Sequence, residues 1–291
     1  MEIYTTFKKE SKNIADYQSV VVAIEKFSIA HDHALTNIEL IQLSMAAKAS
    51  NTKINVLLNK MIFDEDVKDL KKTLEFLKSL AVDGILFSDM AVFMLARDLG
   101  IEHLLIYAPG MTVVNSLDVK EYLDLNIQAV ELANEITLEE KIEIAKNNPG
   151  KVGIVISGYL LMSFSKRLAL SNYFEEINKD VDVFNNYNLK LKEATRDGLM
   201  PTYQSSEGTY IYSEYILDSF KYIKDLMSVD FKYFRIDGIF LSQPIIKDLY
   251  DAYSKQVKDL DLSGLSLTIK NKYPELTFND IFYTTKTSEV K

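Results

Sequence analysis

The chain has 291 residues, 47% of them hydrophobic, and a net charge of −9, so it is long enough to bury a large core. The acidic balance argues against nucleic-acid binding over the general surface, because such binding depends on neutralising phosphates, although a local basic patch or a partner could provide it. The absence of cysteine excludes disulfides, thiolate zinc sites and cysteine-ligated iron–sulphur clusters. No apolar run approaches the length of a membrane span and no signal peptide opens the sequence, so we expect a cytoplasmic protein without a membrane partner.

The first half of the chain alternates short apolar runs with amphipathic segments. Runs rich in Val and Ile are typical of strands covered on both faces. We expect strands at Glu2–Thr6, Val20–Ile24, Lys53–Leu58, Asp83–Phe87, His103–Tyr107, Ala129–Leu132 and Val152–Ile156. Helices are expected between them, over about residues 36–49, 64–80, 90–98, 116–125 and 137–146. Capping boxes at Thr36–Glu39 and Thr137–Glu140 open two of these helices, and Asp64 is expected to cap a third.

After Val152–Ile156 the alternation stops. Residues 175–213 are rich in Asn, Tyr, Lys and Glu with little periodicity, which predicts an inserted loop region. A helical pattern resumes at Tyr215–Met227, a final strand is expected at Phe231–Ile236, and a last helix runs from about Leu249 to Val257. The polar residues 263–291 are expected to form a C-terminal extension packed on the outside.

Repeated strand–helix units with short loops imply parallel strands joined by right-handed crossovers. We therefore predict a (β/α)8 TIM-type barrel over residues 1–262, with the long insertion between its seventh and eighth strands. The main alternative is a doubly wound open sheet, but no glycine-rich phosphate loop follows the first strand.

In a barrel, the functional site lies at the C-terminal ends of the strands. This rule selects a ring of acids, lysines and amides that would suit a polar, anionic small molecule. Among its members are Asn59, Lys60, Asp89, Tyr107, Glu135, Ser157 and Asp237. Each has a structural alternative, since polar groups at strand ends often only satisfy loop backbone. Asp89, for example, precedes a helix that it could merely cap.

Two histidines, His31 and His33, follow the second strand on the same face. With an intervening acid they are candidates for a divalent metal site. The favoured interpretation is an exposed polar loop, because a third ligand would have to come from elsewhere and His103 lies at the opposite face.

A polar, basic cluster follows the seventh strand and contains Ser163, Ser165, Lys166, Arg167 and Tyr173. Lys166 could activate a serine in a serine–lysine pair, but anion binding by Lys166 and Arg167 is preferred. Gly-x-Ser-x-Gly and His-Glu-x-x-His motifs are absent, so no conventional protease mechanism is visible.

Several segments together resemble peptidase family U32, the collagenase-like protease group. The resemblance rests on Ser163–Tyr173, on Arg235-Ile236-Asp237-Gly238, on Asn59-Lys60, on Asp83-Gly84-Ile85 and on Glu207–Ile211, and it covers most of residues 1–260. Ser157-Gly158 stands where family members commonly carry histidine-glycine. In lacking cysteine the chain resembles the short branch of this family. Members of that branch often accompany a longer paralogue, and a chain of this kind would hold no iron–sulphur cluster.

The resemblance implies a barrel and two conflicting functions. One is RNA modification, namely 5-hydroxylation of the tRNA wobble uridine, with a longer paralogue, tRNA and a small carboxylate such as prephenate as partners. The other is a collagenase-like peptidase, and a non-catalytic subunit of a family complex is a third alternative.

For the hydroxylation function, Lys166, Arg167 and Arg235 would clamp an anion, and Tyr159, Phe164 and Tyr173 would stack a base. Lys166, Asp237 and Asp89 are the catalytic candidates. The structural alternative for Arg235 is an internal ion pair with Asp237 that closes the barrel.

Overall fold

The computed structural model describes residues 1–11, 13–31, 33–194, 197–259 and 264–286. In these ranges eight parallel strands follow one another around a barrel, and the last pairs with the first. They are β1 (Glu2–Thr6), β2 (Ser19–Ile24), β4 (Lys53–Leu58), β5 (Gly84–Phe87), β6 (Leu105–Tyr107), β7 (Ala129–Glu131), β8 (Val152–Ser157) and β13 (Tyr233–Ile236). The predicted (β/α)8 barrel is confirmed, and closure excludes the open sheet.

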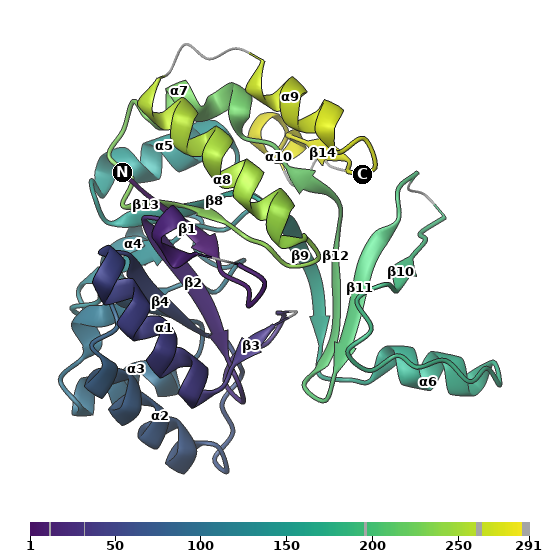
Figure 1. The fold of residues 1–291 in the computed structure, drawn as a ribbon, viewed down its shortest axis with the longest axis horizontal. Helices are drawn as coiled ribbons and strands as arrows, with labels where there is room; N and C mark the ends of the chain where they lie inside the picture. Colours follow the sequence, from purple (N-terminus) through teal and green to yellow (C-terminus); the bar gives the residue numbers. More distant parts are fainter. Residues whose placement is uncertain (12, 32, 195–196, 260–263, 287–291) are drawn as a thin grey trace.

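Helices cover the outside of the barrel (Figure 1). They are α1 (Asn37–Ser50), α2 (Val67–Leu80), α3 (Met90–Asp98), α4 (Ser116–Leu123), α5 (Leu138–Asn147), α7 (Ile223–Leu226) and α8 (Gln243–Lys258). The capping boxes of Thr36 and Thr137 are both formed. The predicted cap at Asp64 is wrong: Asp66 takes the N-cap position of α2, and its carboxylate bonds Lys60 Nζ and Phe63 N instead. None of the described helices is long and apolar enough to cross a membrane.

The barrel interior is filled by inward-facing side chains from alternate strand positions. Tyr4 and Tyr233 stack there with ring centroids 4.2 Å apart. Gly153, on the strand next to Tyr233, makes room for this pair, because a Cβ at that position would lie 2.2 Å from the Tyr233 ring. Two stacked aromatic rings therefore fill this part of the barrel interior, and the absence of a side chain at Gly153 gives them room.

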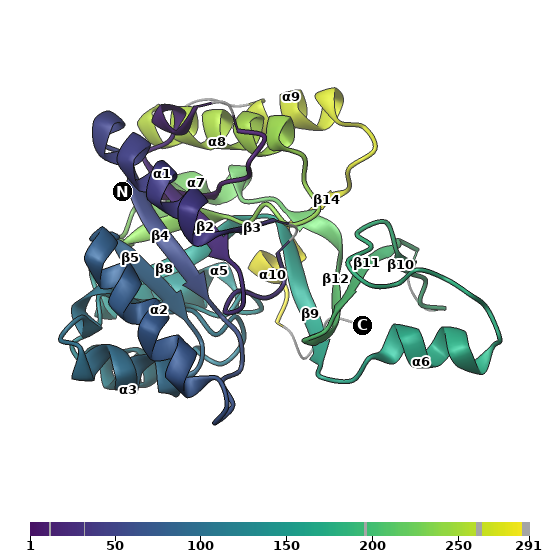
Figure 2. The same ribbon diagram turned by 60° about the horizontal axis from the view of Figure 1, so that its bottom comes forward.

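Residues 159–217 form a second, largely antiparallel sheet that extends from the barrel (Figures 1 and 2). It contains β9 (Tyr159–Ser165), β10 (Lys190–Leu191), β11 (Met200–Ser205) and β12 (Gly208–Leu217). We call this sheet and the projecting α6 (Ala169–Glu176) the arm. The loop predicted at 175–213 is confirmed for residues 177–189, which contain no strand or helix, but β10, β11 and part of β12 lie in the rest, and the helix predicted at Tyr215–Met227 forms only in part. Their tyrosine-rich segments are strands, and only the short 3-10 turn at 220–222 and α7 are helical.

The C-terminal segment packs against the barrel through α9 (Leu265–Lys272), β14 (Phe278–Asn279) and α10 (Ile281–Thr284). β14 pairs with β12, and Tyr283 on α10 is buried. The Tyr283 ring lies 5.3 Å from Nζ of Lys141, a buried lysine on α5 that donates to the carbonyls of Asn134 and Ile136. The extension therefore contributes to the core.

A methyl group at Gly153 should disturb the interior. We expect Gly153→Ala to lower the free energy of unfolding by about 1–3 kcal/mol, because the Tyr233 ring cannot move without losing its stack on Tyr4. Urea denaturation measures this. In a Tyr233→Leu background the same change should cost clearly less, and an equal cost in both backgrounds would contradict the explanation.

Burial of Lys141 should make stability depend on pH. Burial lowers the pKa of Lys141 from 10.5 to about 7, and the negative charge of Glu140, which acts in the opposite direction, offsets only part of this decrease. Between pH 7 and 10 the unfolded chain holds a proton that the folded chain has released, so stability should rise with pH, by up to ~1.4 kcal/mol per pH unit. Urea titrations at pH 7, 8 and 9 should show this gain for wild type relative to Lys141→Met. Parallel profiles for the two proteins would refute it.

Candidate functional site

A cavity of about 390 Å³ opens at the C-terminal ends of the barrel strands, where the sequence predicted the site. One wall is formed by strand ends and loops of the barrel. The other is formed by β9 and β12 of the arm. Its volume lies within the range of small-molecule sites. The barrel and the arm together therefore build one binding-sized cavity.

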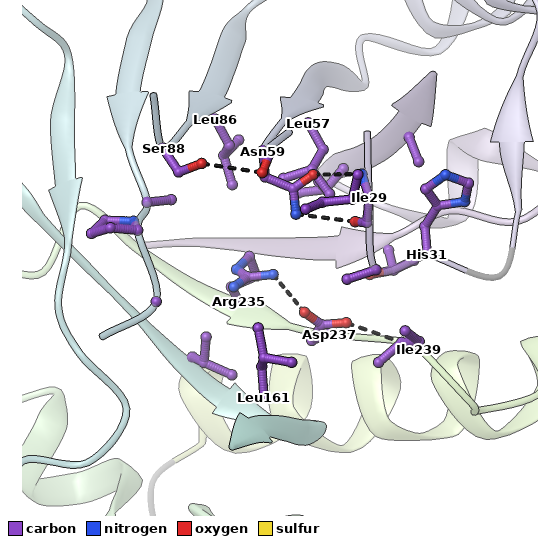
Figure 3. Close-up of a pocket in the computed structure, with 18 of the residues that line it drawn as sticks. Ile29, His31, Leu57, Asn59, Leu86, Ser88, Leu161, Arg235, Asp237 and Ile239 are labelled. Carbon is purple, nitrogen blue, oxygen red and sulfur yellow. Dashed lines mark hydrogen bonds and ion pairs between the residues drawn. The ribbon is translucent and has the colours of Figure 1, made fainter. Parts of the chain in front are cut away.

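The cavity floor holds a buried ion-pair network centred on Arg235 (Figure 3). Arg235 Nε donates to Glu131 Oε2 at 2.7 Å, and Nη2 donates to Glu131 Oε1 at 2.8 Å. Nη1 donates to Asp237 Oδ2 at 2.8 Å. Burial alone would lower the pKa of Arg235, but the charges of Glu131 and Asp237 outweigh it and raise the pKa overall. The internal ion pair considered for Arg235 and Asp237 is formed, and both residues still line the cavity.

Glu131 was missed by the sequence analysis. It lies at the end of β7, is 1% exposed and also accepts a hydrogen bond from the Tyr233 hydroxyl. β7 and β13 are both neighbours of β8, and Gly153 stands between Glu131 and Tyr233 in register. The missing side chain leaves room for the Tyr233 ring, whose hydroxyl bonds the Glu131 carboxylate. An acid in the apolar run Ala129–Leu132 was the signal that could have found it.

On the barrel side, three of the polar residues that line the cavity form hydrogen bonds with backbone groups of the rim loops. The Asn59 amide accepts from Ile29 N at 2.8 Å and donates to Ile29 O at 3.1 Å. Ser88 Oγ donates to Asn59 O. Asp89 accepts from Ala91 N, capping α3, and from Ile62 N. The cap foreseen for Asp89 is therefore present, and these side chains hold the rim loops in place.

Aromatic side chains form the arm side of the cavity. Phe164 and Tyr210 stack with centroids 4.8 Å apart, and Tyr159 and Tyr212 complete the wall. Burial raises the pKa of Tyr159 and of Tyr210, so both stay protonated near neutrality. Tyr107 lines the opposite side and stacks on Tyr122. The wall offers ring surfaces rather than charges.

His31 and His33 also line the cavity, on the connection that follows β2. His31 Nε2 lies 3.1 Å from Ser28 O, and the Tyr187 hydroxyl of the arm donates to His31 O. Over the described ranges no group of three or more His, Cys, Asp or Glu side chains could hold a metal ion. The described residues therefore do not supply a protein-bound divalent metal with a ligand set.

The other predicted residues lie outside the cavity lining. Lys60 is buried and pairs with Asp66 and Glu207, each at 3.3 Å. The Lys60–Glu207 pair ties the arm to the rim of the barrel, and Lys166 of the arm pairs with the same Glu207 at 2.8 Å. Glu135 lies on the loop before α5, Ser165 ends β9, and the exposed Arg167 and Tyr173 lie farther along the arm.

Ser157, predicted at the mouth, is fully buried away from the cavity. A register shift in β8 pairs Arg235 with Val155 but Ile236 with Ser157. Because paired residues in a parallel sheet share a face, the irregularity turns Ser157 to the helix-facing side with Ile236, near Tyr253 of α8.

The arrangement suits a planar polar group. The Arg235–Asp237 pair presents a donor beside an acceptor at the floor, and Phe164, which stacks on the fully buried Tyr210, lies at the wall. Nucleobase edges carry donors and acceptors side by side, and bases bind by stacking on aromatic rings.

Comparison with known proteins agrees with this architecture. The model of the family described as Peptidase family U32 matches residues 3–282. The chain is 25% identical to tRNA hydroxylation protein P2 of Bacillus subtilis, over 78% of this chain and 72% of that protein. It is 31% identical to uncharacterized protease MJ0090 of Methanocaldococcus jannaschii, over 70% of this chain and 50% of that protein. The solved structure of the U32 peptidase Mk0906 is similar in fold, with a TM-score of 0.50 and 14% identity over 82% of this chain and 93% of that one.

Removing one partner of the ion-pair network of Arg235, Glu131 and Asp237 should destabilise the folded protein. We expect Arg235→Met to lower the free energy of unfolding by about 3–5 kcal/mol, because Glu131 would be left buried without its cation. Adding Glu131→Gln to this variant should restore part of the loss. Urea denaturation of both variants measures it, and a double variant no more stable than Arg235→Met would contradict the pairing argument.

Proposed function

The chain belongs to peptidase family U32, and from that premise we propose that it acts in tRNA modification, as part of the 5-hydroxylation of the wobble uridine. The observation that carries the proposal is the cavity, where stacked aromatic rings face a paired hydrogen-bond donor and acceptor. The similarity to tRNA hydroxylation protein P2 of Bacillus subtilis supports the same choice.

In this proposal the target base leaves its stack and enters the cavity. Enzymes that modify a base commonly extrude it from the stack and read its Watson–Crick edge. The ring face of Phe164, with the buried Tyr210 ring behind it, would support the base, while Arg235 would donate to a carbonyl and Asp237 would accept from a ring N–H. Asn59 and Asp89 would act as positioning residues through the loops that they hold.

Phosphate contacts are proposed to come mainly from a partner. The chain carries a net charge of −9, and its arm has Lys166 paired with Glu207, so little positive charge remains for RNA there. A longer member of the family is the proposed partner, and a small carboxylate such as prephenate is the proposed further reactant. Arg167 and Tyr173, exposed on the arm, are the proposed contacts of this chain with RNA.

A peptidase is the second candidate, because the archaeal relative carries a protease name. The geometry favours it less. Lys166, the residue that would activate a serine, bonds the Glu207 carboxylate, and Ser165 Oγ accepts from Arg167 N. Cleavage of gelatin by the purified protein, abolished by Lys166→Ala, would establish this function instead.

Nucleoside mass spectrometry of tRNA from a deletion strain tests the proposal. We expect 5-hydroxyuridine derivatives to fall, to return with the wild-type gene, and to stay low with Phe164→Ala, since stacking on one aromatic ring is worth about 1–3 kcal/mol. Phe184→Ala, which removes an exposed ring outside the cavity, is the matched control and should restore modification. Unchanged derivatives in the deletion strain would refute the proposal.

A further inference from the structure

The positive charge at the cavity floor is already neutralised. Arg235 bonds two carboxylates, those of Glu131 and Asp237, at distances of 2.7 to 2.8 Å. With all three side chains ionised, the group carries one negative charge in total. An anionic ligand entering the cavity would therefore meet no surplus positive charge from this group.

The rest of the lining does not change this balance. Among the described lining residues, the other formally charged side chains are Lys8 and Asp89, which have opposite signs. The remaining wall consists largely of aromatic, aliphatic and amide groups. Burying a carboxylate is strongly unfavourable when no opposite charge compensates it.

Glu131 is held where it is. It is 1% exposed, and it accepts from Arg235 Nε, from Arg235 Nη2 and from the Tyr233 hydroxyl. A ligand carboxylate would have to displace it from all three donors to reach the bidentate edge of Arg235. By contrast, a guanidinium has five N–H groups, and the contacts of Arg235 with described residues use three of them. The others can donate to an uncharged carbonyl without displacing anything.

We propose that Glu131 is a specificity-determining residue, which neutralises Arg235 and so reserves the cavity for an uncharged planar ligand while keeping carboxylates out. This deepens the proposed function, on which it rests for the identity of the natural base. It follows that a carboxylate reactant binds outside this cavity. The sequence-based role of Arg235 as a carboxylate clamp is accordingly replaced by recognition of a neutral carbonyl.

Two ligands that differ in one charge test the proposal directly. Orotate and its amide, orotamide, share the uracil ring and have nearly the same size. In calorimetric titrations the wild-type protein should bind orotamide at least about tenfold more tightly than orotate. Glu131→Gln, which keeps a hydrogen-bond acceptor and raises the total charge of the group from −1 to zero because Asp237 still pairs with Arg235, should weaken or abolish that preference.

The matched control is Glu139→Gln, which makes the same change in net charge at an exposed position on α5 and should keep the wild-type preference. If Glu131→Gln does not fold, Asp237→Asn removes the other carboxylate on Arg235 and should shift the preference in the same direction. Equal binding of the two ligands by wild type, no binding of either, or an unchanged preference in the folded variant would overturn the proposal. Discrimination in the cavity together with unaltered tRNA in the deletion strain would instead reject the proposed function alone.

Discussion

The contact between Arg235 and Glu131 inside the barrel organises the rest of the site. It joins two strands that are not neighbours but both flank β8, where Gly153 leaves room for the Tyr233 ring. A buried guanidinium of this kind needs carboxylates around it, and those carboxylates set the electrostatics of the cavity above. Stability of the interior and choice of ligand thus depend on the same few atoms.

The arm supplies the second wall of the cavity, which the barrel alone would leave open. A barrel presents strand ends and loops at its mouth, but the aromatic wall comes from strands inserted after β8. Several contacts hold the arm over the mouth; among them, Glu207 forms an ion pair with Lys60 on the rim, and the Tyr187 hydroxyl donates to the His31 carbonyl. The predicted histidine pair and the predicted rim lysine therefore lie where the arm and the barrel meet.

Under the proposed function, the charge distribution separates two tasks, recognition of the base and recognition of the phosphate backbone. The cavity suits a neutral base, because its ionised groups leave no surplus positive charge for an anion and the Phe164 ring offers a stacking surface. Attraction of the phosphate backbone needs excess positive charge, which an acidic chain with paired lysines supplies poorly. Base recognition in this chain and phosphate recognition in a partner are a consistent division of labour.

The sequence by itself determined the barrel, because its evidence is local: apolar runs, capping boxes at Thr36 and Thr137, and the regular alternation of strands and helices. It also placed the site at the strand ends. Only the tertiary structure paired Arg235 with Glu131, 104 residues away, and turned Ser157 out of the mouth through a register shift. The strands of the arm were not predicted for a similar reason: they pair across a long insertion, and their tyrosine-rich sequence does not alternate regularly between apolar and polar residues. Local propensity specifies elements, whereas partners of buried charges depend on which strands become neighbours.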